Sequence, residues 1–213
     1  MIKIDKVEVV GWEHAIRGMR NPLNSWKVSD SGYKTEYDEG GWSAEVFTVG
    51  ENDLNLMKRL ASAGTDHAKY RRMITVYADL VAPLYWWKEY DTYKVGTVAN
   101  SCSTMHKIQA KEFTLNDFSH EQLDYTSKCM LKDIISVLNK NREIFNNTKD
   151  KQYWWNMIQL LPSSYNQKRT VMLNYEVLRN MYHSRKNHKL TEWREFCKWI
   201  ESLPYSELIT GGI

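Results

Sequence analysis

The sequence predicts a single α+β domain over residues 1–213, with strands early in the chain and helices late. Segments rich in Ile and Val occur at residues 2–10 and 73–81, as expected of strands. After residue 119, apolar residues recur every three or four positions, which is the period of an amphipathic helix. No repeat, low-complexity tract or linker divides the chain, and its length suits one domain.

The N-terminal elements are expected to be short. Residues 2–10 predict a strand, and residues 12–19 predict a helix that ends near Asn21-Pro22, because the residue before proline avoids the α region. Residues 22–50 are mostly polar, so we expect a long loop, or a β excursion at 42–49 where alternation returns.

The rest of the chain predicts one more strand and then mostly helices. A buried strand is expected at 73–81, and Ala82-Pro83 is expected to open a helix through Tyr93, since proline is tolerated in a first helical turn. Residues 95–106 are small and polar, which favours a loop or an extended segment. Helical spacing predicts further helices at residues 51–63, about 119–145, 150–160, 168–187 and 191–203.

Composition excludes several classes of protein. Lys and Arg number 29 against 26 Asp and Glu, and a net charge of +3 spread along the chain does not suggest a nucleic-acid or membrane-surface binder. Three widely spaced cysteines suggest a reduced intracellular protein without a disulfide framework or metal site. No signal peptide or long apolar run is evident, so we expect a soluble cytoplasmic protein. Nine Trp and thirteen Tyr suit pockets and subunit interfaces as well as cores.

The first candidate site lies in the C-terminal block. At helical spacing, Asn174 and Arg185 bracket an apolar stripe on one side of the helix predicted at 168–187. A guanidinium on such a face suits a planar, oxygen-rich ligand such as a pyrimidine or phosphate. The alternative is an arginine that pairs with Glu176 or Glu192.

The second candidate site is the segment Lys94–His106, in which hydroxyl, amide and thiol side chains follow a lysine. Backbone N–H groups, hydroxyls and a nearby cation suit phosphate binding, although a plain surface turn has the same composition. Neither mononucleotide glycine motif is present. The tryptophan doublets Trp86-Trp87 and Trp154-Trp155 are expected in the core, with at most one member of each lining a site, because adjacent helical residues point apart.

Together these two blocks resemble the flavin-dependent thymidylate synthases, the ThyX family. That family carries an Ala-Pro before a helix, then an Arg-His-Arg motif, and later a Leu-Pro followed by an Asn-x-Arg helix that ends in an arginine. Ala82-Pro83 and Leu161-Pro162 stand at the corresponding places, Asn174 follows Pro162 by twelve residues, and Arg185 follows Asn174 by eleven. Glu192-Trp193-Arg194 looks like the family's Trp-Glu-Ile-Arg stretch in altered order. The resemblance spans most of the chain.

The sequence also departs from the family's motifs. Thr92-Tyr93-Lys94 stands at Arg-His-Arg, so only Lys94 remains cationic, and Ile158 stands where a phosphate-contacting arginine is expected. Thr97 and Cys102 fall on the motif's two serines. Ala99-Asn100 replaces Asn-Glu, and Thr104-Met105 replaces Arg-Tyr. In the C-terminal block, Glu176 replaces the arginine of Asn-x-Arg. Nearby cations that are candidates to replace the lost ones are Lys88, Lys107, Arg71, Arg72, Lys168 and Arg169.

The resemblance implies a central mixed or antiparallel sheet flanked by helices, a homotetramer, and a flavoprotein methyltransferase of nucleotide biosynthesis. It implies FAD as cofactor, a uracil nucleotide (dUMP) as substrate, and NADPH and methylenetetrahydrofolate as possible co-substrates. The residues it implies are Arg185, Lys94, Thr97 and Ser101 for substrate, and Lys94, Asn100, Asn174 and Asn180 for cofactor.

The resemblance leads to two further expectations, one for Cys102 and one for Arg185 with Lys94. Cys102 is either a nucleophile toward an electron-poor pyrimidine carbon or a small structural cysteine. Arg185 and Lys94 are expected to converge on one nucleotide-sized cleft. The alternatives are a catalytically inactive nucleotide- or partner-binding protein on the same scaffold, a related pyrimidine modification, and an unrelated helical interaction protein.

Overall fold

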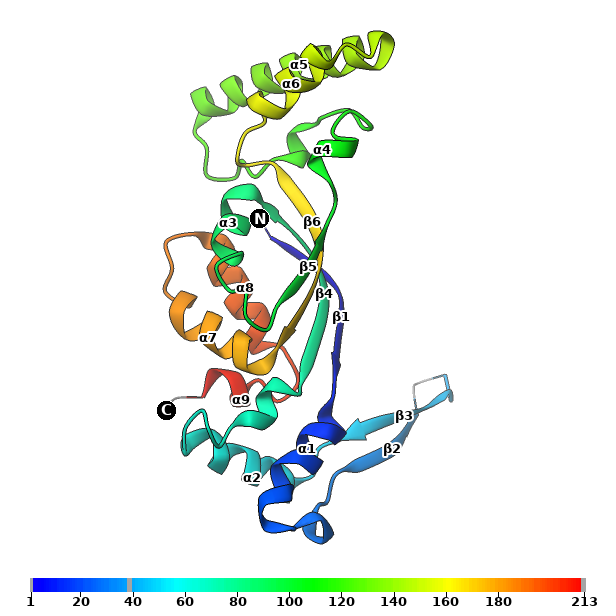
Figure 1. Ribbon diagram of the computed structural model, residues 1–213, viewed down its shortest axis with the longest axis vertical. Helices are drawn as coiled ribbons and strands as arrows, with labels where there is room; N and C mark the ends of the chain where they lie inside the picture. Colours follow the sequence, from blue (N-terminus) through cyan, green and yellow to red (C-terminus); the bar gives the residue numbers. More distant parts are fainter. Residues whose placement is uncertain (1, 38–39, 212–213) are drawn as a thin grey trace. The chain divides into compact units, whose positions relative to one another are not determined.

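The structure is a computed structural model that describes residues 2–37 and 40–211 (Figure 1). The strands are β1 (Lys3–Val10), β2 (Gly32–Tyr37), β3 (Ser43–Thr48), β4 (Thr75–Pro83), β5 (Val98–Ser101) and β6 (Asn166–Asn174). The helices are α1 (Trp12–Arg20), α2 (Glu51–Ser62), α3 (Leu84–Tyr90), α4 (Thr104–Lys107), α5 (Tyr125–Thr148), α6 (Lys151–Leu160), α7 (Tyr175–Arg185), α8 (Thr191–Glu201) and α9 (Glu207–Thr210). Short 3-10 turns are η1 (Asn21–Leu23), η2 (Trp26–Val28), η3 (Lys69–Arg72) and η4 (Leu115–Asp117).

The strands form two sheets. Four of them make an antiparallel sheet in the order β1-β4-β6-β5, and β2 pairs with β3 in a separate antiparallel hairpin. In that hairpin Gly32 lies opposite Thr48, and Tyr37 lies opposite Ser43. The predicted α+β class with a central antiparallel sheet is confirmed.

The chain divides into two compact units. The first unit holds the residues up to Lys6, Ala78–Lys94 and Ala99–Val171, and the second holds Val7–Tyr77, Val95–Val98 and the residues from Met172 on. The single domain over residues 1–213 stays a prediction.

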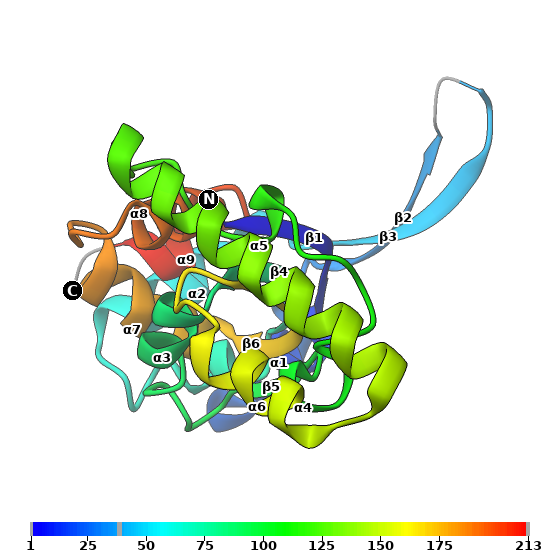
Figure 2. The same cartoon turned by 90° about the horizontal axis from the view of Figure 1, so that it is seen from above.

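The first unit contains its own apolar core. The long helix α5 and the shorter α6 form a helical hairpin (Figures 1 and 2), and each begins at an aspartate whose carboxylate accepts a backbone N–H of the first turn. Asp124 accepts from Ser127 at 2.7 Å, and Asp150 accepts from Gln152 at 2.9 Å. The buried residues of this core are Ile108, Phe113, Phe118, Leu131, Ile135, Leu138 and Met157.

The core of the second unit gathers around α7. Helix α7 contacts α8 and α9, and its first residue, Tyr175, packs edge-on against Trp12 of α1 with ring centroids 5.4 Å apart. The Tyr175 hydroxyl donates to the carbonyl of Pro204 at 2.5 Å. Burial of large aromatic rings with their polar tips satisfied stabilises this unit strongly.

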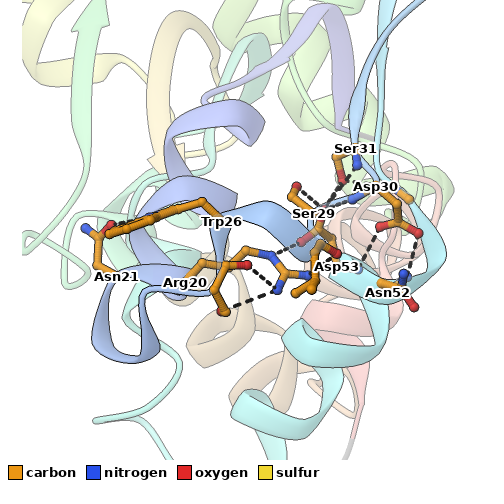
Figure 3. Close-up of polar contacts among 11 residues, drawn as sticks. Arg20, Asn21, Trp26, Ser29, Asp30, Ser31, Asn52 and Asp53 are labelled. Carbon is orange, nitrogen blue, oxygen red and sulfur yellow. Dashed lines mark hydrogen bonds and ion pairs between the residues drawn. The ribbon is translucent and has the colours of Figure 1, made fainter.

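A buried ion pair joins α1 to α2 in the second unit (Figure 3). Arg20 donates from Nε to Asp53 Oδ1 at 2.5 Å, and the Ser29 and Ser31 hydroxyls each donate to Asp53 Oδ2 at 2.6 Å. Burial alone would raise the pKa of Asp53, but the hydrogen bonds from Ser29, Ser31 and Arg20 outweigh it, so the pKa lies below its usual value. The carboxylate therefore stays charged in the fold and fixes the loop before the hairpin.

The same loop caps helix α2. Asp30 accepts the backbone N–H of Asn52 at 2.9 Å and that of Asp53 at 3.1 Å, so a carboxylate twenty residues upstream takes the place of a local N-cap. Gly50, at the N-cap position, contributes no side chain, and a Cβ there would lie 2.2 Å from the Asp30 carboxyl group. Glycine at position 50 makes the long-range cap possible.

Most of the predicted elements are confirmed, but the helix predicted at 168–187 is wrong. Strand β6 occupies Asn166–Asn174, and helix α7 begins only at Tyr175. In β6 the buried residues alternate, with Gln167, Val171 and Leu173 on one side, which is the period of a strand. Asn174 ends the strand and starts the helix, since its side chain accepts the N–H of Val177 at 3.0 Å.

Two smaller predictions are corrected. The segment 95–106 contains the expected extended piece, strand β5, but it also contains helix α4, which was not predicted. Ala82-Pro83 ends strand β4, and helix α3 starts one residue later, at Leu84. The β excursion expected at 42–49 is confirmed as strand β3, which pairs with β2 in a hairpin.

Candidate functional site

The two blocks that carry the resemblance meet within the second unit. Gly96 has a φ of +81°, and a Cβ at this position would lie 2.9 Å from Val177 Cγ2 and 3.1 Å from Asn174 Nδ2. Only glycine allows the backbone next to Thr97 to approach the start of α7 this closely. The Asn174 amide uses its oxygen to cap α7 and presents its nitrogen, a hydrogen-bond donor, toward Gly96.

Helix α7 carries the other two predicted residues of the C-terminal block. Arg185 is partly buried, and its guanidinium carbon lies 4.9 Å from the centroid of the Trp193 ring, which is a cation–π contact. Asn180 is exposed. This contact restrains the guanidinium, which is the kind of group that binds planar, oxygen-rich ligands.

One alternative partner of Arg185, Glu176, lies in a different ion pair. Arg71 Nε lies 2.8 Å from Glu176 Oε2, and both side chains are buried. Burial lowers the pKa of Arg71, and the Glu176 carboxylate offsets part of this effect. Arg71 also donates to the carbonyl of Leu208 at 3.3 Å, so this cation supports the fold and is a poor candidate for binding phosphate.

The first unit holds the residues predicted around Cys102. Asn100 and Ser101 are exposed at the end of β5, and the Cys102 thiol is also exposed. The backbone N–H of Cys102 donates to the carbonyl of Lys168 at 2.9 Å, which attaches this segment to β6. Three polar residues are thus placed on one exposed strand end.

Arg169 on β6 is connected to this strand end by hydrogen bonds through Gln167. From the sequence it was only one of several cations that are candidates to replace the lost arginines. Its Nε donates to Gln167 Oε1 at 3.0 Å, and Gln167 Nε2 donates to the carbonyl of Cys102 at 2.9 Å. The guanidinium also pairs with Asp91 at 2.7 Å and lies 4.2 Å from the centroid of the Trp87 ring. The strand period of β6 was the available signal, because it places Gln167 and Arg169 on the same face.

Lys94 is exposed in the first unit, after α3, whereas Arg185 belongs to the second unit. Their convergence on one cleft stays a prediction. Among the other cations, Lys168 pairs with Asp79 at 2.8 Å. That contact lowers the pKa of Asp79 and raises the pKa of Lys168.

A cavity large enough for part of a cofactor lies in the second unit, beside α1, α2 and η3. Its volume is about 580 Å³, within the range of small-molecule sites. Arg59, His67 and Lys69 supply cationic or protonatable groups at its wall, while Leu56, Leu60, Tyr70 and Met73 supply apolar surface. A second cavity of about 390 Å³ lies nearby, between α1 and the hairpin residue Phe47. Arg20 lines both cavities, so the buried ion pair with Asp53 holds a shared wall.

Two features are absent from residues 2–37 and 40–211. No helix there combines the length and hydropathy needed to cross a membrane. No group of three or more His, Cys, Asp or Glu side chains there is placed to hold a metal ion.

The fold is that of the flavin-dependent thymidylate synthases. The chain is similar to the thymidylate synthase ThyX from Helicobacter pylori in complex with FAD and dUMP, with 15% identity, a TM-score of 0.67 and 98% of each chain covered. A second structure of that enzyme with FAD and dUMP gives a TM-score of 0.68 at 15% identity, over 99% of this chain and 98% of the other.

A UMP/dUMP methylase, PolB from Streptomyces cacaoi bound with 5-Br dUMP, is also similar. It is 11% identical, with a TM-score of 0.59, over 94% of this chain and 88% of the other. The sequence matches no protein-family model, and no curated protein matches it. The expected fold is therefore confirmed by structure and not by sequence similarity.

Proposed function

We propose that the chain is a flavin-dependent enzyme of the thymidylate synthase kind, which binds FAD and a uracil nucleotide and methylates the pyrimidine reductively. The observation that carries the proposal is the agreement of fold along nearly the whole of both chains with an enzyme that holds FAD and dUMP. The contact between Gly96 and Asn174 supports it, because it joins the two segments whose motifs resemble that family.

The chemistry of the residues fits a flavin nucleotide. FAD carries a pyrophosphate and a planar ring, and the 580 Å³ cavity offers Arg59 and Lys69 beside apolar side chains. Asn174, Asn180 and Asn100 supply amide donors and acceptors for the polar edge of the ring system, and Lys94 supplies a charge for phosphate. When bound, FAD supplies the hydride chemistry, which no amino-acid side chain can provide.

The substrate side of the proposal assigns a role to each polar residue. Arg185, held flat by Trp193, donates to the pyrimidine oxygens and stabilises negative charge that develops on the ring. Lys94 and Arg169 meet the phosphate, and the hydroxyls of Thr97 and Ser101 hydrogen-bond to the sugar or phosphate. The exposed Cys102 thiol is the candidate nucleophile for a pyrimidine carbon. Methylenetetrahydrofolate as one-carbon donor, NADPH as reductant and a homotetrameric assembly complete the proposal.

Purification and binding test the proposal directly. The protein should purify yellow or take up FAD on titration with the visible absorption of an oxidised flavin, and it should bind dUMP in calorimetry. Arg185→Ala should weaken dUMP roughly 10- to 150-fold, since a hydrogen bond to a charged group is worth about 1.5–3 kcal/mol. Lys186→Ala, an exposed cation one residue further on, is the matched control and should change little. A colourless protein that binds neither FAD nor dUMP would eliminate the proposal.

The replacement of Arg-His-Arg by Thr92-Tyr93-Lys94 favours one second candidate, a binding protein without catalysis on the same scaffold. Mass spectrometry of dUMP incubated with the FAD-loaded protein, methylenetetrahydrofolate and NADPH separates the two. Formation of dTMP, or rescue of a thymidine-requiring strain, establishes the enzyme. Tight nucleotide binding without product establishes the binding protein.

A further inference from the structure

A cavity of about 480 Å³ lies in the first unit, and none of its lining residues has a role in the proposed function. Its walls come from α4 and the residues after it, from the end of α5 and from the start of α6. Its lining residues are Met105, His106, Gln109, Phe145, Lys151, Trp154 and Trp155.

Two indole rings form a corner of this cavity. The rings of Trp154 and Trp155 have centroids 4.8 Å apart and planes inclined by 72°. Trp154 is held in place, since its Nε1 donates to the carbonyl of Met105 at 3.0 Å, while Trp155 is 47% exposed. Both Trp154 and Trp155 contribute to the wall of the cavity. The expectation that at most one member of this doublet lines a site is therefore wrong.

The polar groups of the cavity have unmet hydrogen-bonding capacity. The Gln109 side-chain oxygen is buried and accepts no hydrogen bond within the described residues, while its nitrogen donates to the carbonyl of His106 at 3.3 Å. A buried acceptor without a donor is costly, so such groups are rare in folded proteins. A ligand N–H or O–H would satisfy this oxygen once the side chain turns toward the cavity that it lines.

The rim of the cavity carries positive charge. Lys151 is exposed in the first turn of α6, and its ammonium makes no ion pair within residues 2–37 and 40–211. The exposed His106 lies on the same lining. The cavity thus presents an aromatic corner, one unpaired acceptor and one unpaired cation.

We propose that this cavity binds an anionic nitrogen heterocycle, of which a nucleoside monophosphate is the simplest natural form. The planar ring stacks on Trp155, a ring N–H or amino group donates to Gln109 Oε1, and the phosphate meets Lys151. The volume lies within the range of small-molecule sites. The proposal uses none of the residues assigned to FAD or dUMP, and it gives the chain a second ligand.

Isothermal titration calorimetry on the full-length protein loaded with FAD and dUMP tests this proposal. AMP and GMP are the probes. Adenosine, which lacks the phosphate, and ribose 5-phosphate, which lacks the base, are the comparison compounds. Saturation with FAD and dUMP removes the flavin site from the measurement. We expect one AMP or GMP site per chain, weaker binding of adenosine and no binding of ribose 5-phosphate.

Three variants assign the site. Trp155→Ala should weaken the nucleotide roughly 5- to 150-fold, the usual value of one base stacked on one aromatic ring. Lys151→Met should weaken it about 2- to 5-fold in low salt, since the ammonium is exposed. Gln109→Leu should weaken it with little change in the melting temperature of the free protein, because the replaced oxygen has no donor and the replaced nitrogen makes only an exposed 3.3 Å bond to the carbonyl of His106. Trp42→Ala removes another exposed indole, in the second unit, and is the matched control that should leave binding unchanged.

Several results would overturn the proposal. One is the absence of heat with either probe at millimolar concentration, and another is unchanged affinity in Trp155→Ala. A short single-stranded oligonucleotide that binds through Trp155 more tightly than any mononucleotide would show that the cavity serves nucleic acid instead. FAD and dUMP binding should be the same in Trp155→Ala as in the unaltered protein, so failure here is distinguishable from failure of the proposed function.

Discussion

Replacing Asp53 with asparagine should destabilise the second unit by about 3–5 kcal/mol, the cost of leaving one member of a buried ion pair without its partner. Arg20 is 4% exposed and Asp53 is fully buried. Asp53 Oδ2 also accepts four hydrogen bonds, from the hydroxyls of Ser29 and Ser31 and from the backbone N–H groups of Asp30 and Ser31. An amide nitrogen in place of that oxygen would face only donors. The loss is a large part of a typical stability of about 5–15 kcal/mol.

The same substitution should remove a pH dependence. The folded pKa of Asp53 is lowered from its ordinary 3.8, so its contribution to stability is complete above that value and is lost as the pH falls through the folded pKa. The difference in unfolding free energy between the unaltered protein and Asp53→Asn should therefore be largest near neutral pH. It should shrink in acid below the ordinary pKa of the carboxyl group.

Urea denaturation followed by tryptophan fluorescence, at neutral pH and in acid, measures both effects. Glu51→Gln, an exposed acid in the first turn of the same helix, is the control and should cost less than about 1 kcal/mol. The double variant Arg20→Met with Asp53→Leu should be more stable than either single variant, since no buried charge remains. A loss below about 1 kcal/mol for Asp53→Asn, or an equal loss at both pH values, would refute this reasoning.

Two further predictions concern the candidate site. Gly96→Ala should lower the free energy of unfolding by about 1–3 kcal/mol, because Gly96 has a positive φ and a Cβ there would lie 2.9 Å from Val177. It should also weaken FAD binding. Gly32→Ala is the control, since Gly32 has open space around it, and it should cost less in the same thermal melts. A thiol reagent should label the exposed Cys102 quickly, and Cys197 only after unfolding, because burial raises the pKa of that thiol to about 11. FAD and dUMP together should slow the labelling of Cys102, and equal rates with and without ligand would remove this thiol from the site.

The fold could be predicted best where one face of an element is buried. Helices α2, α6 and α8 were found within a few residues, because their apolar residues repeat with the period of the element. Strand β1 was found from its Ile and Val content, although none of its residues is buried. The hairpin β2–β3 is mostly exposed on both strands. Alternation at 42–49 indicated β3, but β2 was not predicted, and the register depends on pairing that sequence alone does not reveal.

The boundary between β6 and α7 shows a different limit. Strand and helix follow each other without a turn, so apolar residues with period two run directly into residues with period 3.6. In a sequence window that covers both elements, the helical period of α7 dominates because α7 is the longer element. Asn174 is a preferred N-cap residue, and treating it as a cap instead of a member of the helical face would have located the boundary.

The candidate site was predicted in parts. The residue types of the two blocks were recognisable from spacing, and the start of α7 does lie against the segment at Gly96. The chain of contacts through Gln167, Arg169 and Asp91 was not predictable, because it depends on which strand of the sheet lies beside β5. The sequence alone could not exclude either member of the buried pair Arg71–Glu176 from the binding site, since burial is a property of the whole unit.

The two ends of the β2–β3 hairpin are held together by hydrogen bonds. This arm, residues 32–48, can therefore change without altering the positions at which the chain enters and leaves it. The Ser31 hydroxyl oxygen accepts the N–H of Gly50 at 2.9 Å, and Gly32 pairs with Thr48, so the chain departs and returns at a single point. The arm can therefore be trimmed, lengthened or exchanged for a foreign peptide at an entropic cost that grows only slowly with its length. Natural variation in length and the insertion of affinity or reporter sequences would both be best tolerated here.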